Sequence, residues 1–286
     1  MNEGRAGLGE GSQAVAREDV QAWERIEAIV AQMRGLDEEI LVAFSGGVDS
    51  TLVAALAHRA VGPRAVAVTA VSETLAAREL EEAIALASEI GIRHEQIAFS
   101  ELADERFVEN TSARCFYCQS MRFGQLQKMG ESLGFRVVAS GTNASDLGDH
   151  RPGLKAMEAL RVYQPLLEHE VDKAMVRRMA RALGLSAWDK PAAACLSSRI
   201  PHGMEVTTQR LRRIEAAEEV LHAQGFRQFR VRDHGGIARV EISTLELPEA
   251  LSARRLGELG QAILEAGFEH VALDLVGYRT GSLNPV

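Results

Sequence analysis

The run Ser45-Gly46-Gly47-Val48-Asp49-Ser50 has the residue types and spacing of an anion-binding site. It follows the apolar residues 40–44 and precedes a helical pattern at 51–59, so its glycines fall in a turn between a strand and a helix. Glycines let backbone amides approach a phosphate, serines add hydroxyl donors, and the start of a helix favours negative charge. The run therefore predicts binding of a nucleotide phosphate.

The run is not a Walker motif, because no Gly-Lys-Ser/Thr follows its glycines. It resembles the PP-loop, the Ser-Gly-Gly-x-Asp-Ser motif of the ATP pyrophosphatases. That resemblance implies ATP cleavage between the α and β phosphates, with AMP left on the substrate and pyrophosphate held by Ser45, Gly46, Gly47, Asp49 and Ser50. An ordinary tight turn is the alternative interpretation of so short a match.

A second polar loop, residues 140–153, follows the short strand predicted at 137–139. It also lies at the carboxyl end of a strand, so we expect Gly141 and Thr142 to line the same crevice as the first loop. The carboxylates of Asp146 and Asp149, together with Asp49, suit a Mg²⁺ ion that bridges ATP phosphates. A surface loop rich in Asp, Gly and Pro is the alternative.

The chain has three cysteines, Cys115 and Cys118 in a CxxC pair and the distant Cys195. Two thiolates at that spacing and a third from another loop suit an iron–sulfur cluster or zinc. A redox pair and inert buried thiols are the alternatives. Because the number is odd and no export signal is present, a disulfide scaffold is not expected.

One carboxylate, Glu218, falls in the apolar stripe of the helix predicted at 207–224, four residues after Ile214 and three before Leu221. Burying a carboxylate without a partner is costly, so we expect either that a cation meets Glu218 or that it faces a cleft. A solvent-exposed edge of the stripe is the alternative.

The strands predicted at 229–232 and 237–242 gather charges on one face of a hairpin. Alternation places Arg230 and Arg232 on the same face, about 7 Å apart, and Arg239 and Glu241 on the corresponding face of the partner strand. Two guanidiniums can fork around a phosphate or carboxylate, which favours a site for an anionic substrate or for pyrophosphate. A solvated sheet face is the alternative.

Alternating strands and helices must position these residues. Strands at 40–44, 65–71, 94–99 and 137–139 alternate with helices at 51–59, 76–90 and 121–133, which predicts an α/β fold with a parallel sheet covered by helices on both faces. A helix at 171–183 follows. Residues 207–276 then predict a small αββαβ module. We therefore divide the chain into a flexible lead-in (1–17), a nucleotide domain (18–200) and a C-terminal domain (201–286).

Composition is that of a globular protein: 286 residues, 46% hydrophobic and 25% charged. No apolar run approaches the roughly eighteen residues of a membrane helix, so a cytoplasmic protein with no membrane partner is expected. The net charge of −8 supplies no general attraction for nucleic acid, which disfavours a large RNA substrate.

Taken with the first loop, residues 141–153, 191–203 and 277–282 are similar to the LarE family of PP-loop sulfur transferases. The family usually carries two adjacent acids where this chain has Ser145-Asp146. The resemblance implies that ATP adenylates a carboxylate of pyridinium-3,5-biscarboxylic acid mononucleotide and that sulfur then displaces AMP, giving a thiocarboxylate on the way to a nickel-pincer nucleotide. By motif, the residues that the family uses for substrate and phosphate fall on Ser198, Arg199, Glu218, Arg230, Arg232 and Glu241.

The resemblance also implies how sulfur is supplied. Some family members sacrifice the sulfur of one cysteine, which corresponds to Cys195, and are left with dehydroalanine. Others hold a [4Fe-4S] cluster on three cysteines and leave one iron open for an extra sulfide. The presence of Cys115 and Cys118 favours the cluster version here. Family members assemble as hexamers, so a homo-oligomer is expected.

Other functions remain open. Another PP-loop enzyme is one rival: a tRNA thiolase, for which a basic RNA-binding module is expected, or an amide-forming ligase such as NAD or GMP synthetase, which does not need three cysteines. A metal-dependent sensor whose loop merely holds AMP is a rival outside enzymology. It predicts no pyrophosphate release with any carboxylate.

Overall fold

The computed structural model describes residues 7–148, 152–191, 194–250 and 253–279, which form two compact units. The first unit contains the described residues up to Val71, Ala77–Phe99 and Gln119–Lys190. The second contains Ser72–Ala76, Ser100–Cys118 and the described residues from Pro191 on. The longest segment of the second unit thus begins at Pro191, whereas the boundary predicted from the sequence lies after residue 200. The second unit also includes two earlier segments, which a single boundary does not describe.

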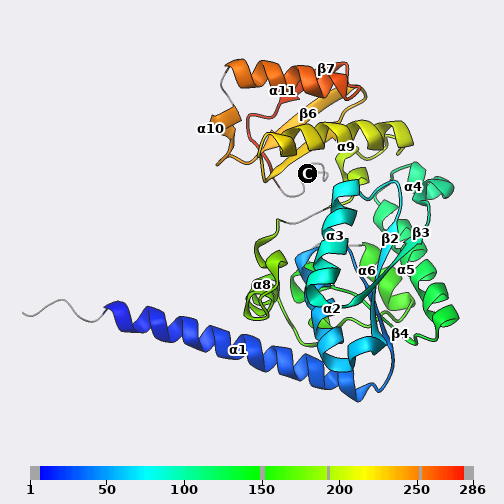
Figure 1. The fold of residues 1–286 in the computed structure, drawn as a ribbon. Coiled ribbons are helices and arrows are strands. Elements are labelled where there is room, and N and C mark those ends of the chain that lie inside the picture. Colours follow the sequence, from blue (N-terminus) through cyan, green and yellow to red (C-terminus); the bar gives the residue numbers. More distant parts are fainter. Residues whose placement is uncertain (1–6, 149–151, 192–193, 251–252, 280–286) are drawn as a thin grey trace, which may run out of the picture. The chain divides into compact units, whose positions relative to one another are not determined.

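The first unit is built on a parallel sheet of order β3-β2-β1-β4 (Figure 1). Its strands are β1 Ile40–Ala43, β2 Ala65–Val71, β3 Arg93–Ala98 and β4 Val137–Ala139. Strands β2 and β3 follow one another on one side of β1, while β4 pairs with the other side. The order in which strands are added to the sheet therefore reverses between β1 and β4, and in such sheets ligands bind beyond the carboxyl ends of the strands at that point.

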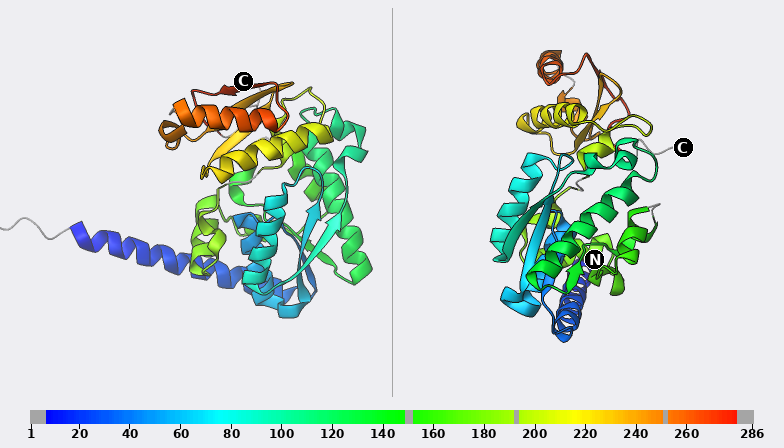
Figure 2. Two further views of the ribbon diagram at one scale, coloured as in Figure 1. Left: turned by 45° about the horizontal axis from the view of Figure 1, so that its top comes forward. Right: turned by 90° about the vertical axis from the view of Figure 1, so that its right-hand side faces the viewer.

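Helices cover both faces of this sheet, as predicted (Figure 2). Because side chains alternate along a strand, Ile40 and Val42 join the core on one face and Leu41 joins the core on the other. The first core contains residues of α1, α2, α3 and α8; the second contains residues of α5 and α6. These helices are α1 Gly7–Gly35, α2 Val48–Val61, α3 Ala77–Ile90, α5 Arg114–Leu133, α6 Pro152–Ala159 and α8 Lys173–Ala182.

The N-terminal helix α1 begins at Gly7, whereas the sequence analysis predicted a flexible lead-in as far as residue 17. In the second half of the helix Ile26, Ile29, Val30 and Met33 are buried. Their spacing of three and four residues forms one apolar stripe, which packs against α2 and α8. Residues 26–33 therefore belong to the core of the first unit.

The second unit contains the predicted αββαβ module. In it β5 pairs antiparallel with β6 and β6 pairs parallel with β7. The elements are α9 Thr208–Ala223, β5 Phe229–Asp233, β6 Ile237–Ile242, α10 Leu247–Ala250, α11 Ala253–Glu265 and β7 His270–Leu273. Shorter helices outside this module are α4 Glu105–Val108 in the second unit and α7 Pro165–Glu168 in the first.

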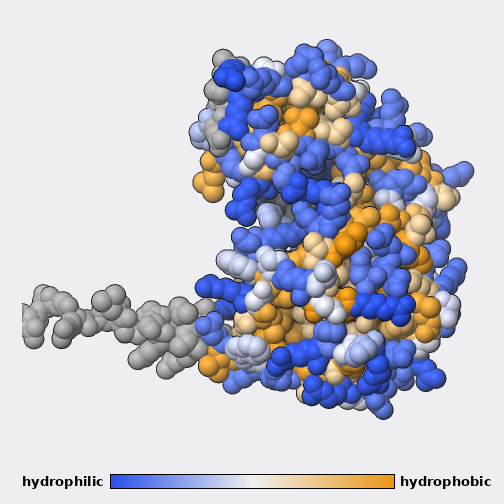
Figure 3. All heavy atoms as spheres, in the orientation of Figure 1, coloured by the Kyte–Doolittle hydropathy of each residue, from blue (hydrophilic) through white to orange (hydrophobic). Residues whose placement is uncertain are grey.

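Hydrophilic side chains predominate on the face drawn in Figure 3, with apolar ones interspersed among them. Over the described part of the chain, none of the helices has the length and apolar character that crossing a bilayer requires.

Candidate active site

The first loop joins β1 to α2, as predicted. Gly46 has φ +68°, a conformation that residues with a Cβ atom rarely adopt, and a Cβ there would lie 3.0 Å from the Cα of Ala83. Ser50 Oγ ties the loop together: it accepts from Ser45 N at 3.2 Å and donates to the carbonyl of Gly47 at 3.1 Å. Gly47 is the N-cap of α2 and brings no capping side chain. The loop thus exposes the start of a helix to an anion.

The second loop lies directly against the first, as expected for two loops at the carboxyl ends of neighbouring strands. A Cβ on Gly141 would lie 2.7 Å from Ser50 N and 2.9 Å from the carbonyl carbon of Asp49, so glycine alone permits this approach. Asn143 adds a hydrogen bond from its amide to Asp49 Oδ1 at 3.1 Å. Thr142 is buried, with its hydroxyl 3.1 Å from Ser140 Oγ.

The predicted magnesium carboxylates are held by neighbouring groups. Asp49 Oδ2 pairs with the ammonium of Lys173, and Asp146 Oδ2 accepts from Asn143 N at 3.0 Å. Asp149 lies outside the described residues. Within the described ranges, no three His, Cys, Asp or Glu side chains form a group that could hold a metal. Magnesium binding by these carboxylates stays a prediction.

Two lysines at the first loop escaped the sequence analysis. Lys173, the first residue of α8, reaches Asp49 from 124 residues further along, and Lys190 donates to the Gly46 carbonyl at 2.8 Å from 144 residues further along. No local pattern marks a lysine that arrives from so far away.

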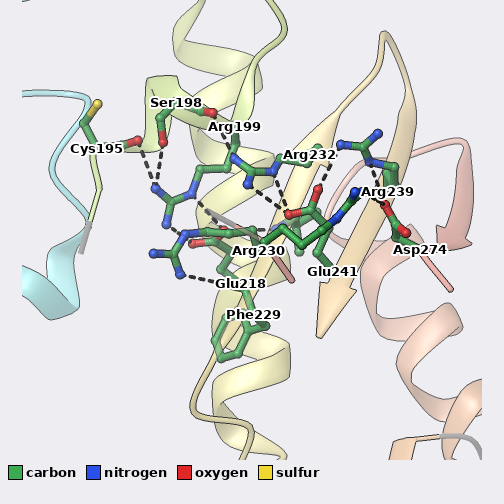
Figure 4. A network of polar contacts seen from close by, with 12 residues as sticks. Cys195, Ser198, Arg199, Glu218, Phe229, Arg230, Arg232, Arg239, Glu241 and Asp274 are labelled. Atoms are coloured by element: carbon green, nitrogen blue, oxygen red, sulfur yellow. Dashed lines mark hydrogen bonds and ion pairs between the residues drawn. The ribbon is translucent and has the colours of Figure 1, made fainter. Parts of the chain in front are cut away.

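In the second unit, Glu218 is met by a cation, as its place in the apolar stripe predicted. Arg199 donates to both carboxylate oxygens of Glu218 at 2.9 Å, and Val231 N donates to Oε1 at 3.0 Å (Figure 4). The side chains of Arg199 and Glu218 are only 4% and 14% exposed. A bidentate, charge-assisted pair satisfies a carboxylate that would otherwise be costly to bury.

Arg199 also organises the segment that carries Cys195. Its guanidinium donates to the carbonyls of Ala194 and Cys195, the latter at 3.0 Å, and to Ser198 Oγ at 3.1 Å (Figure 4). The sulfur of the half-buried Cys195 lies 3.1 Å from Ser197 Oγ. Cys195 therefore sits on a short backbone segment that one buried arginine fastens to α9.

The four charged residues share one face of the hairpin, as predicted. Arg230 lies opposite Glu241, and Arg232 lies opposite Arg239. The fully buried Glu241 accepts from Arg232 at 2.9 Å and from Arg239 at 2.9 Å, and Arg232 also donates to the Ser198 carbonyl at 3.1 Å (Figure 4). The face is therefore a buried ionic network, not a solvated surface.

Arg230 is held differently from Arg232. It donates to the Phe229 carbonyl at 2.6 Å, and its guanidinium lies 5.2 Å from the centre of the Tyr278 ring. Burial, and then the positive charge of Arg199, lower the pKa of Arg230. The negative charge of Glu218 acts in the opposite direction and raises the pKa of Arg230.

The three cysteines differ in their surroundings. Cys115 is exposed, whereas Cys118 is buried and donates to Glu101 Oε1 at 3.5 Å. Glu101 is fully buried and also accepts from Thr74 Oγ1 at 3.0 Å. In the part of the chain that the structure describes, Cys115, Cys118 and Cys195 form no group that could hold a metal.

Comparison with known proteins agrees with this architecture. Residues 21–123 match the model of the NAD synthase family, which spans the first three strands and the first loop. A parallel sheet with a Ser-Gly-Gly-x-Asp-Ser loop at the end of its first strand defines an ATP-utilising enzyme of the PP-loop class.

Three relatives are similar to this chain over much of its length. It is 43% identical over 255 residues to an uncharacterized protein of Synechocystis sp., covering 89% of this chain and 95% of that protein. It is 35% identical over 264 residues to the pyridinium-3,5-bisthiocarboxylic acid mononucleotide synthase of Lactiplantibacillus plantarum, covering 90% and 92%. A tRNA-specific 2-thiouridylase of Sphingopyxis alaskensis is 26% identical, covering 66% and 59%. The chain belongs to the LarE family of ATP-dependent sulfur transferases.

Proposed function

We propose that the protein adenylates a carboxylate of pyridinium-3,5-biscarboxylic acid mononucleotide and converts it to a thiocarboxylate. The observation that carries this proposal is the packing of Gly141 on the first turn of α2, which builds a two-loop phosphate site in a chain of this family. The synthase of L. plantarum, named for a bisthiocarboxylic acid mononucleotide, supports the choice of substrate.

In the first step a carboxylate oxygen of the substrate attacks the α phosphorus of ATP. The bond between the α phosphorus and the bridging oxygen breaks, and pyrophosphate leaves with that electron pair. The amides at the start of α2 stabilise the negative charge of the departing group. The product is an acyl-adenylate, whose carbonyl carbon carries a good leaving group.

In the second step the thiolate of Cys195 attacks that carbonyl carbon, AMP leaves, and a thioester links the substrate to the protein. A base then accepts the Cα proton of Cys195, the electron pair of that C–H bond forms a Cα=Cβ double bond, and the Cβ–S bond breaks with its electrons going to sulfur. The sulfur departs with the substrate as a thiocarboxylate, and dehydroalanine remains in the chain. Arg199, which holds the carbonyls around Cys195, is the residue that keeps this segment in place.

The arginine network suits the phosphate of a mononucleotide. Arg199, Arg230, Arg232 and Arg239 supply four guanidiniums, while Glu218, Glu241 and Asp274 supply three carboxylates (Figure 4). A phosphate dianion bound beside Arg230 gains charge-assisted hydrogen bonds and relieves repulsion between buried guanidiniums. These charges support an anionic substrate over a neutral one.

Among the described residues Cys118 donates to Glu101 and Cys115 is exposed, and neither belongs to a group that could hold a metal as arranged. We therefore derive the sulfur step from Cys195 alone. Anaerobic purification followed by an iron count and an absorption spectrum tests this choice. An iron-free protein that turns over once and loses the mass of one sulfur supports it, whereas a four-iron protein whose activity disappears in Cys115→Ala contradicts it.

Replacing Cys195 with serine is expected to separate the two steps. Pyrophosphate release from ATP should persist in the presence of the substrate, because adenylation does not use the thiol, while thiocarboxylate formation should fall to background. A pyrophosphate assay and mass spectrometry of the product measure the two steps on the same sample. Thiocarboxylate formed at the wild-type rate by Cys195→Ser would show that sulfur comes from elsewhere.

Thiolation of a tRNA base is the second candidate, favoured by the similarity to the 2-thiouridylase of S. alaskensis. It uses the same activation by ATP but requires a surface that attracts RNA, and the net charge of −8 offers no general attraction. Pyrophosphate release stimulated by tRNA, and not by the pyridinium mononucleotide, would favour this candidate.

A further inference from the structure

Lys190 contacts the first loop but takes no part in either of the two proposed steps. Its ammonium donates to the Gly46 carbonyl at 2.8 Å and pairs with Glu82 Oε2 at 2.7 Å. The side chain is only 19% exposed. Because the ammonium is largely buried and is bound to both Gly46 and Glu82, the side chain of Lys190 is held in one orientation.

Neighbouring residues hold both ends of this lysine. Arg177 of α8 donates to the carbonyls of Trp188 at 2.7 Å and of Lys190 itself at 2.8 Å, which fixes the backbone. At the other end, burial would raise the pKa of the Glu82 carboxyl, but hydrogen bonds and positive charge from Lys190 and Arg78 lower it. Glu82 is therefore ionised at neutral pH, and the ammonium is held by a true ion pair.

The contact with Gly46 determines where the next amide points. A trans peptide is planar, so the Gly46 carbonyl and the Gly47 N–H point in opposite directions. With the carbonyl bound to Lys190, the N–H faces away from the lysine and donates to Ser45 Oγ at the long distance of 3.4 Å. An anion oxygen can replace so weak a contact. A cation on the carbonyl also polarises the same peptide, which strengthens the N–H as a donor.

Helix α3 restrains the same glycine from a second direction. Ala83 lies beside Gly46, where a Cβ on the glycine would come within 3.0 Å, and Glu82 precedes it in the helix. One turn of α3 thus restrains Gly46 in two ways. Ala83 limits its position by direct contact, and Glu82 limits the orientation of its carbonyl by holding Lys190.

We propose that Lys190 is a positioning residue for pyrophosphate: bound to the Gly46 carbonyl, it turns the Gly47 N–H toward the anion and strengthens it as a donor. Glu82 keeps the ammonium on the carbonyl and away from the anion. The inference rests on the proposed function, because it concerns the loop that receives the departing pyrophosphate.

Calorimetric titration of the full chain with magnesium pyrophosphate, and separately with AMP, tests this role. Lys190→Met should weaken pyrophosphate binding about ten- to a hundredfold, the equivalent of one charge-assisted hydrogen bond, and leave AMP binding unchanged. Lys190→Arg should recover part of the loss. Lys128→Met, at an exposed position of α5, is the matched control and should bind both ligands as the wild type does.

Glu82→Gln distinguishes a positioning lysine from one that binds the anion directly. If Lys190 acts through Gly46, freeing its charge from Glu82 should leave pyrophosphate binding unchanged or weaker. Tighter binding in Glu82→Gln would overturn the inference, and so would unchanged binding in Lys190→Met. A wild-type chain that binds AMP but no pyrophosphate would overturn the proposed function instead.

Discussion

Replacing Gly141 with alanine is expected to lower ATP-dependent pyrophosphate release by about a hundredfold or more. The added Cβ would lie 2.7 Å from Ser50 N and 2.9 Å from the carbonyl carbon of Asp49. Both are backbone atoms of the first turn of α2, so the strain cannot be relieved by turning a side chain. The two loops must separate, which displaces the amides that receive the phosphate. Pyrophosphate release under saturating ATP measures the effect.

Gly124→Ala is the matched control for this substitution. Gly124 lies within α5, and a Cβ there meets nothing within 4 Å. Alanine is the better helix former by about 1 kcal/mol, so the control should retain activity and be as stable as the wild type or slightly more stable. If Gly141→Ala remains as active as Gly124→Ala, the close approach of the two loops is not needed for catalysis.

Replacing Arg199 with methionine is expected to destabilise the protein by about 3–5 kcal/mol and to abolish sulfur transfer. The substitution leaves the carboxylate of Glu218, only 14% exposed, without the guanidinium that donates to both of its oxygens. It also removes the donor that holds the carbonyls of Ala194 and Cys195. Urea unfolding followed by circular dichroism measures the change in the free energy of unfolding.

A double variant separates the buried charge from other effects of this substitution. Arg199→Met combined with Glu218→Leu removes both charges, so it should recover much of the lost stability without recovering activity. Arg254→Met is the control for an exposed pair, because Arg254 is 89% exposed beside Glu258, and it should change stability by no more than about 1 kcal/mol. A double variant no more stable than Arg199→Met would contradict the buried-charge explanation.

Local patterns predicted the framework of the site. The apolar run at 40–44 and the glycines after it predicted strand, turn and helix, and β1, the first loop and α2 confirm them. Alternation predicted that Arg230 and Arg232 share one face of the hairpin with Arg239 and Glu241, and the pairing of β5 with β6 confirms it. These predictions succeed because the periods of helix and strand are local properties of the chain.

Local patterns do not identify contacts between residues that are distant in the sequence. The periodicity of α9 indicated that Glu218 needs a cation or a cleft, but only the fold selects Arg199, which comes from another element. The same holds for Cys118, which the CxxC spacing grouped with Cys115 and which instead donates to the buried Glu101. The spacing of two cysteines shows only that their thiols could bind the same metal, whereas the packing around them determines which groups they contact.

The first loop shows both contributions in one place. The sequence by itself determined that Ser45 to Ser50 form a turn before a helix, of a kind suited to a phosphate, because glycines and a helix start act through their own backbone. Only the tertiary structure decided how that turn is held: Gly141 packs on its helix, Ala83 limits Gly46, and Lys190 binds the Gly46 carbonyl. The physical reason is that orienting one peptide requires groups on several of its sides, and in this chain they come from segments that only folding brings together.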